Sequence, residues 1–300
     1  MIKTKQEKAF EVFASVVMIC VMVIVIFPFL LLFISSITEE NTLLINGYSI
    51  FPEKLSFDAY KYIWNSRDVI FRAYGITVCV TVIGTLAHVA IVAMAAYPLS
   101  LRNLPGRSFF SFAILFTMLF NGGLVPTYMI YTMVFHIKNT YWALLVPNLL
   151  FSSFNCIIVR TYLQSNVPSE LYESAKIDGA SEFQIFRRIV LPLGKPIFVT
   201  VGVFAGLNYW NDWTNGLYYL SGNEGQKLYS IQNLLNQMIT NIQYLSSGKV
   251  TGNIGAEVAK LPTTSIRMAI AFIAMLPLFI IYPFLQKYFA EGITLGAVKG

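Results

Sequence analysis

Charged residues are scarce in this chain. Asp, Glu, Lys and Arg make up 12% of its 300 residues, whereas a soluble domain carries about 25%. Hydrophobic residues make up 56%, and the mean hydropathy is +0.62. So few charges cannot cover a water-soluble surface of this size, and so apolar a chain is neither disordered nor a coiled coil. The composition therefore predicts a membrane protein with several spans.

Cysteine is also scarce: Cys20, Cys79 and Cys156 each lie inside an apolar run. They fit neither a zinc-binding spacing nor a disulfide framework, and we interpret them as small packing residues. Lys and Arg outnumber Asp and Glu by 21 to 15, but these charges cluster between the apolar runs. That distribution indicates membrane topology and not a surface for nucleic acid.

Six apolar stretches are long enough to cross a bilayer, which takes about 20 residues of helix. Lipid offers no hydrogen bonds to an open backbone, and the stretches do not alternate in polarity, so we expect helices and not a barrel. The expected spans are residues 12–37, 73–97, 108–135, 140–160, 196–220 and 265–287. The sequence thus predicts an all-α membrane protein with a single domain over residues 1–300.

The first apolar run follows Lys3, Lys5 and Lys8 and resembles a signal peptide, but it is too long for one, so we expect an uncleaved anchor. Placing the N-terminus in the cytoplasm leaves most Lys and Arg residues on that side, as the positive-inside rule requires. Six spans then put both termini in the cytoplasm. The cytoplasmic side also holds one long loop, residues 164–195, and a tail, residues 288–300.

The cytoplasmic loop has local signals for two short helices separated by a turn. Ser169 lies at the start of the first, and Asp178-Gly179 is a turn signal at its end. Ser181 with Gln184 forms a capping-box pattern that starts the second helix, and Pro192 stops it.

The second of these helices has an apolar face that includes Phe183, Phe186 and Val190. An apolar face on a loop in water needs a partner. It packs against the ends of the protein's own helices, lies on the lipid interface or docks onto another protein, and local propensity does not choose among these.

The spacing of the loop residues matches a known motif. The matching positions are Glu173, Ala175, Gly179, Ile189, Leu191 and Pro192. They resemble the EAA loop in the permease subunits of bacterial ABC importers, which docks into a cleft of the ATPase subunit. Ser174 stands where the motif has its second Ala, and Ser is nearly as small. The resemblance extends over the full chain to the MalG-like half of maltose-type permeases, through residues 121–127, 139–143, 210–212 and 292–300.

This resemblance implies the type I ABC importer permease fold in the bacterial cytoplasmic membrane. The implied partners are a MalF-like second permease, two ABC ATPase subunits, an extracytoplasmic solute-binding protein and an oligosaccharide that crosses by alternating access. The tail of such permeases reaches the ATPase, which assigns Gly296 and Lys299 to that contact. The loop residues assigned to ATPase coupling are Glu173, Ser174, Ala175, Asp178, Gly179, Ala180, Phe183 and Phe186.

The chain has no G-x-x-x-x-G-K-[ST] sequence, the phosphate-binding loop of many ATPases. Gly194-Lys195-Pro196 lacks both the upstream glycine and the hydroxyl residue. We therefore expect no enzyme activity, no catalytic residue, no metal site and no cofactor in this chain, with ATP and Mg used by the partner ATPase subunits.

Asp212 is the acidic residue within the expected spans, and a carboxylate in a membrane is costly enough to suggest a function. It follows Trp210 and Asn211, and Asn155 is a polar residue in another span. Amides and carboxylates bond sugar hydroxyls, and an indole stacks on a sugar ring, so we predict that these four side chains contact solute. The alternative is a structural role, which we also expect for His88.

Two other functions remain open at this stage. One is a membrane receptor or scaffold that has the fold but transports nothing. The other is an ABC importer of another solute class, such as peptides or phosphate esters. An anionic solute would favour Lys or Arg inside the spans; the charge-free stretches of the spans, among them residues 73–101 and 268–286, contain none, and we expect a neutral solute. The outer loop, residues 221–263, is either a contact surface for the binding protein or a passive connector.

Overall fold

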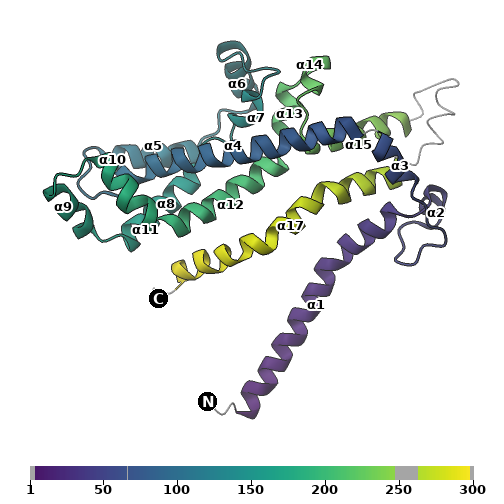
Figure 1. The fold of residues 1–300 in the computed structure, drawn as a ribbon, viewed down its shortest axis with the longest axis horizontal. Helices are drawn as coiled ribbons and strands as arrows, with labels where there is room; N and C mark the ends of the chain where they lie inside the picture. The colour runs from purple at the N-terminus through teal and green to yellow at the C-terminus, as the bar shows by residue number, and fades with distance from the viewer. Residues whose placement is uncertain (1–3, 66, 247–262, 298–300) are drawn as a thin grey trace. The chain divides into compact units, whose positions relative to one another are not determined.

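The structure is a computed structural model that describes residues 4–65, 67–246 and 263–297. Over these ranges the chain is helical, and its one extended pairing is an isolated antiparallel bridge between Thr38 and Leu55. Figure 1 shows the succession of helices. The prediction of an all-α protein is therefore confirmed.

The chain forms two compact units, one of residues 1–70 and 235–279 and the other of residues 71–234 and 280–300. The first unit contains α1 (Lys5–Ser36), α2 (Glu40–Asn46) and α3 (Asp58–Asn65). Three helices contribute residues to both units: α4 (Arg67–Ser100), α15 (Ile231–Ser246) and α17 (Thr263–Ala297).

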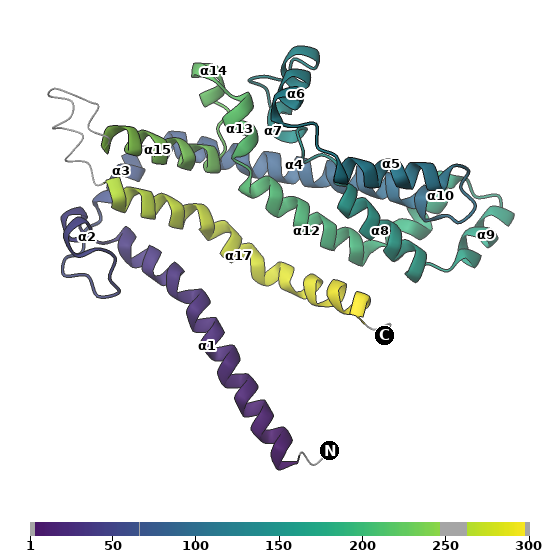
Figure 2. The ribbon, with the colours of Figure 1, turned by 180° about the vertical axis from the view of Figure 1, so that it is seen from behind.

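Within the first unit, α1 is a long apolar helix (Figure 2), and its side chains are exposed along most of its length. Its last turns pack against neighbours: the Ser36 hydroxyl lies 2.8 Å from the Tyr60 hydroxyl, and the ring centroids of Phe33 and Phe272 lie 4.9 Å apart. A long exposed apolar helix is stable when lipid or another membrane protein surrounds it.

Glu40, at the start of α2, joins the beginning of α17 in the same unit. Its carboxylate accepts hydrogen bonds from the backbone amides of Thr264 and Ser265, each at 2.8 Å. These amides belong to the first turn of α17, where backbone N–H groups have no carbonyl acceptor within the helix. A negative charge there also interacts favourably with the helix dipole, so Glu40 fixes the start of the last long helix.

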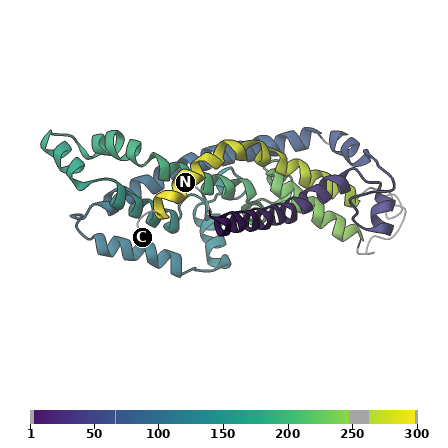
Figure 3. The same ribbon diagram turned by 90° about the horizontal axis from the view of Figure 1, so that it is seen from below.

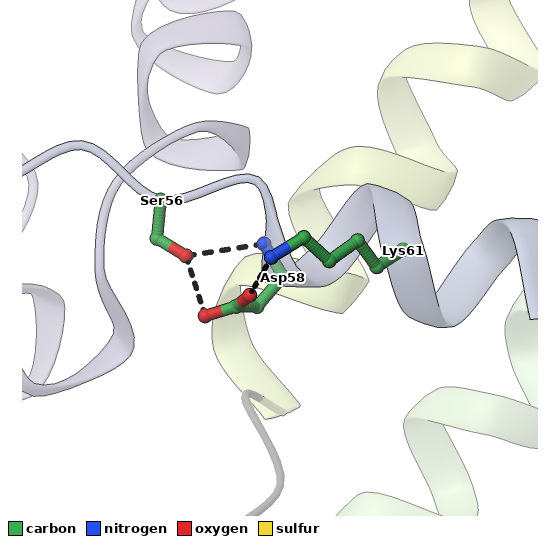
Figure 4. A network of polar contacts seen from close by, with 3 residues as sticks. All are labelled: Ser56, Asp58 and Lys61. Atoms are coloured by element: carbon green, nitrogen blue, oxygen red, sulfur yellow. Dashed lines mark hydrogen bonds and ion pairs between the residues drawn. The ribbon is translucent and has the colours of Figure 1, made fainter.

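Figure 4 shows the polar contacts that start α3. The Ser56 hydroxyl donates to the Asp58 carboxylate at 2.8 Å and accepts from the Asp58 amide at 3.1 Å. The Lys61 ammonium lies 2.9 Å from the other carboxylate oxygen of Asp58. Hydrogen bonds from Lys61 and then from Ser56 lower the pKa of the Asp58 carboxyl below its ordinary value of 3.8.

The second unit holds the remaining helices. They are α5 (Arg107–Leu119), α6 (Leu124–Met129), a π-helical turn (Ile130–Val134), α7 (Trp142–Leu145), α8 (Ser153–Asn166), α9 (Ser169–Ile177), α10 (Glu182–Ile185), a second π-helical turn (Phe186–Val190), α11 (Leu191–Leu193), α12 (Lys195–Asn211), α13 (Thr214–Tyr219) and α14 (Gly222–Gln226). Helices α9 to α11 lie at one end of this unit and project beyond α8 (Figures 1 and 3).

The main core of the second unit lies among α4, α8, α12 and the loop of residues 164–195. Its fully buried side chains include Val92, Val159, Leu163, Val190 and Val201. Burying aliphatic side chains from four separate segments fixes the loop against the helices. A second core, around Tyr209 and Tyr219, joins α7, α12 and α13.

Three described helices are long and apolar enough to cross a membrane: Lys8–Ser36, Arg67–Ser100 and Thr264–Pro283. Two bent pairs meet the same test if each pair is one span, which gives up to five. The pairs are Arg107–Leu119 with Leu124–Val134, bent by 110°, and Glu182–Leu193 with Lys195–Asn211, bent by 79°. The count of six spans therefore stays a prediction.

Three of the expected spans are not single continuous helices. Residues 108–135 break after α5 at Asn121-Gly122-Gly123, where Gly123 has φ +88°, a conformation that favours glycine. Residues 140–160 break at Pro147-Asn148, with Asn148 at φ +60°, before Ser152 caps α8. Residues 196–220 break at Asp212, between α12 and α13. Local turn chemistry overrides the apolar composition at all three breaks.

Candidate functional site

The loop of residues 164–195 forms the predicted pair of helices. Helix α9 ends at Ile177, and Gly179 has φ +79°, so the chain turns without the strain that a side chain would meet there. The Ala180 amide donates to the Ala175 carbonyl at 2.9 Å and closes the turn. Ser181 and Gln184 form the complete capping box. The local signals for two helices and a turn are thus confirmed. The prediction that Pro192 stops the second helix is wrong, because Pro192 lies in the first turn of α11, where its missing N–H costs no hydrogen bond, and the chain breaks at Gly194.

Most of the residues assigned to ATPase coupling are exposed. Glu173, Ser174, Asp178, Gly179 and Phe183 face solvent, whereas Ala175, Ala180 and Phe186 are half-buried against the core. The Phe183 side chain is 71% exposed and that of Ile177 is 87% exposed, on either side of the turn. Two large apolar side chains exposed on a projecting loop are typical of a contact surface for another protein.

Sequence reasoning missed the residue that fastens this loop to α4. The Tyr97 hydroxyl, near the end of α4, donates to the Glu182 carboxylate at 2.8 Å. Lys176 forms an ion pair of 2.7 Å with the other oxygen of Glu182. Hydrogen bonds from Lys176 and then from Tyr97 lower the pKa of the Glu182 carboxyl. No local pattern indicates this contact, because Tyr97 and Glu182 are 85 residues apart.

A polar cavity of about 970 Å³ lies beside α9. Its lining comes from the turn between α4 and α5, the end of α8, and α9 itself. Both signs of charge face it, including Arg102, Arg107, Glu170 and Glu173. Glu173 therefore belongs both to the exposed motif and to this polar recess.

The tail residues are only partly described. Gly296 lies near the end of α17, which extends to Ala297. Lys299 lies outside the described residues. Their assignment to the ATPase contact stays a prediction.

Asn155 is buried and bonded within the protein. Its amide nitrogen lies 2.9 Å from the Nε2 atom of His88, and the Nδ1 atom of His88 lies 2.7 Å from the Leu149 carbonyl oxygen. Asn155 and His88 are 4% and 2% exposed. This chain of contacts gives His88 the structural role expected for it and holds the Asn155 amide inside the protein.

The other predicted solute residues lie at the end of α12. Trp210 is buried, and within the described residues its indole nitrogen has no hydrogen-bond partner. Asn211 is exposed and donates to the Leu207 carbonyl at 2.9 Å. Asp212 accepts from the amides of Thr214 and Asn215 at 3.1 and 3.3 Å, and so caps α13. Asn155 instead pairs with His88, and a solute contact by these four side chains stays a prediction.

Two candidate spans carry a basic residue near their starts. The candidate spans Arg67–Ser100 and Thr264–Pro283 begin earlier than the apolar stretches, and they include Arg72 and Arg267. The expectation that no Lys or Arg lies inside the membrane stays a prediction.

Comparison with known proteins identifies the class. Residues 6–295 match the family described as binding-protein-dependent transport system inner membrane component. The chain belongs to this family. It is a permease subunit of an ABC importer in the inner membrane and not an enzyme, since ATP is hydrolysed by a separate subunit.

Individual relatives cover nearly the whole chain. Protein LplC of Bacillus subtilis (strain 168) is 37% identical over 99% of this chain and 97% of its own length. The polygalacturonan/rhamnogalacturonan transport system permease protein YtcP of the same organism is 38% identical over 92% of this chain and 93% of its own length.

A solved structure shares the fold. It is a bacterial ABC transporter involved in the import of the acidic polysaccharide alginate, with a TM-score of 0.78 and 24% identity over 96% of this chain and 99% of that one. The type I ABC importer permease fold implied by the sequence is thus confirmed.

Proposed function

We propose that this chain imports an oligosaccharide, delivered by a solute-binding protein, by alternating access driven by ATP hydrolysis in two partner ATPase subunits. The observation that supports it most is the projecting loop α9 to α11, whose motif residues Glu173, Asp178 and Phe183 are exposed and free to dock. The polygalacturonan/rhamnogalacturonan permease that resembles this chain supports a sugar solute.

The solute to test first is an oligosaccharide that contains uronic acids. Galacturonan and alginate are polymers of uronic acids, and they are named for the relative YtcP and for the solved transporter respectively. Arg72 and Arg267 lie near the starts of two candidate spans of this chain, and positive charge near a solute path attracts an anionic solute. A neutral oligosaccharide is the matched alternative.

The finer assembly and topology belong to this proposal. We propose six spans with both termini in the cytoplasm, pairing with a MalF-like second permease, and contact of Gly296 and Lys299 with the ATPase. We also propose that solute contacts Asn155, Trp210, Asn211 and Asp212.

The experiment is uptake by vesicles reconstituted with both permeases, the ATPase subunits and the binding protein. Radiolabelled oligogalacturonides and neutral oligosaccharides of equal length are supplied with and without ATP inside the vesicles. The proposal predicts ATP-dependent accumulation of one class. A complex that hydrolyses ATP normally yet accumulates neither class would favour importers of other solutes, and a complex that neither hydrolyses ATP nor accumulates solute would favour a receptor or scaffold.

A further inference from the structure

The loop that faces the ATPase is covalently continuous with α8 on one side and with α12 on the other. Movement of this loop therefore reaches α8 and α12 through the backbone. Helix α4 is a candidate span of 34 residues, and it has no such connection, because α5 to α7 separate it from α8 in the chain. Side-chain contacts must therefore transmit movement from the loop to α4.

Tyr97 makes these contacts with both arms of the loop. Its ring centroid lies 5.9 Å from that of Tyr172 on α9 and 5.8 Å from that of Phe186 in the second π-helical turn. Its hydroxyl donates to Glu182, the first residue of α10. Tyr97 and Tyr172 are 6% and 7% exposed. A buried residue with contacts to both arms holds them at a fixed distance from α4.

The Glu182 carboxylate of α10 is the acceptor that connects this helix with α4 and α9. One carboxylate oxygen receives the Tyr97 hydroxyl of α4, and the other pairs with Lys176 of α9. The Lys176 and Glu182 side chains are 48% and 60% exposed, so their ion pair is weak. The bond from the buried hydroxyl to the carboxylate is charge-assisted and is the stronger of the two.

We propose that Tyr97 is a positioning residue that couples movement of the ATPase-facing loop to α4 through its hydrogen bond to Glu182 and its ring contacts with Tyr172 and Phe186. This inference rests on the proposed function, since it concerns how that loop drives transport. Without the hydroxyl, the loop still docks and ATP is still hydrolysed, but α4 follows the loop less closely.

The test is Tyr97→Phe in the complete reconstituted complex, with solute uptake and ATP hydrolysis measured in the same vesicles. This change keeps the ring and removes the hydroxyl. Uptake per ATP hydrolysed should fall about tenfold, the population change expected when one hydrogen bond to a charged group is lost. This ratio does not depend on how much complex is inserted, so a loss of folded protein would not mimic the effect.

Tyr162→Phe is the matched control. Tyr162 lies on α8, is half-buried and packs against the same core, and within the described residues its hydroxyl has no hydrogen bond. This variant should keep the wild-type ratio. Glu182→Ala should lower the ratio of uptake to hydrolysis as Tyr97→Phe does. The double variant should have no lower a ratio than Glu182→Ala alone, because both changes remove the same hydrogen bond.

Amide hydrogen exchange in residues 169–190 gives a readout independent of transport. Tyr97→Phe should speed exchange in α9 and α10 relative to Tyr162→Phe. If the wild-type complex transports no oligosaccharide, the proposed function fails, while the exchange comparison still tests the contact. A Tyr97→Phe complex with wild-type exchange and a wild-type ratio of uptake to hydrolysis would overturn the inference.

Discussion

The two ends of α12 present their polar side chains in different ways. Before its first residue, the loop α9 to α11 exposes Glu173 and Asp178, and its own caps and turn hold it folded. After its last residue, Asp212 is engaged in capping α13. The loop is thus folded by its own contacts and leaves polar side chains exposed. The Asp212 carboxylate, in contrast, is already engaged in stabilising α13. An exposed, internally capped segment indicates docking more directly than a polar residue in an apolar run does.

The largest expected effect comes from changing the exposed loop α9 to α11. Gly179→Val forces a β-branched side chain into φ +79°, which costs about 1–2 kcal/mol in the left-handed conformation, and it places bulk on the proposed ATPase contact. Uptake should fall to background while the amount of inserted protein stays close to wild type, as measured by vesicle transport and membrane immunoblotting.

Gly47→Val is the control for backbone strain. Gly47 also ends a helix, with φ +73°, and a Cβ there likewise meets no atom within 4 Å. It lies outside the proposed ATPase contact, so uptake should persist. Equal loss of uptake in both variants would mean that strain, and not docking, explains the result.

Charge reversal tests the same surface without backbone strain. Glu173 is exposed, so Glu173→Arg should leave folding unchanged, since exposed substitutions alter stability by about 0.5 kcal/mol or less. We expect stimulation of ATP hydrolysis by the loaded binding protein to be lost. Wild-type stimulation and uptake would remove Glu173 from the docking surface.

Asn155→Leu should act through stability. It leaves the Nε2 atom of the buried His88 without its partner, which costs about 1–3 kcal/mol. Thermal unfolding of the purified complex should show the loss. Asn166→Leu on the same helix is the control, because that exposed amide bonds only the Tyr162 carbonyl among the described residues. A wild-type unfolding temperature for Asn155→Leu, with weaker solute affinity, would instead support its contact with solute.

Two substitutions of Asp212 distinguish its capping of α13 from the effect of its charge. Asp212→Ala removes the cap of α13 and should cost about 1 kcal/mol, whereas Asp212→Asn keeps an equally good cap. Thermal unfolding should therefore separate the two variants. If Asp212→Asn is as stable as wild type but takes up solute poorly, the carboxylate has the proposed contact with solute; if uptake is unchanged in both, Asp212 serves the fold.

The smallest effect is expected at the contacts of Asp58. Its pKa is lowered in the folded protein, so its contribution to stability is present above the ordinary value of 3.8 and is lost as pH falls through the lower, folded value. Because the ion pair with Lys61 is exposed, Lys61→Ala should not measurably change the unfolding temperature at neutral pH. A clear decrease at neutral pH would show that this exposed pair stabilises the fold.

The sequence predicts what depends on nearby residues. The capping box of Ser181 with Gln184 and the turn at Gly179 are formed by neighbours a few positions apart, and both are present. The contacts of Tyr97 with Glu182 and of Asn155 with His88 join residues 85 and 67 positions apart. No local pattern specifies such partners, because tertiary packing selects them.

The interrupted spans show a different limit. Composition over residues 108–135 indicates one helix, yet the Gly-Gly pair and the 110° bend divide it. Turn signals were present in the sequence, but a count of apolar residues gives them too little weight. The apolar count also ends a span where the first charge appears, and so it left Arg72 outside a helix that begins at Arg67.

The central claim is that the exposed loop α9 to α11 docks onto the ATPase. Photo-crosslinking tests this claim most directly. A benzophenone side chain at Phe183, which is 71% exposed on the loop, is compared with one at Phe51, which is 88% exposed in the region between α2 and α3. Docking of the loop predicts an adduct of permease and ATPase mass from position 183 and none from position 51. No ATPase adduct from position 183, in a complex that still hydrolyses ATP and takes up solute, would contradict it.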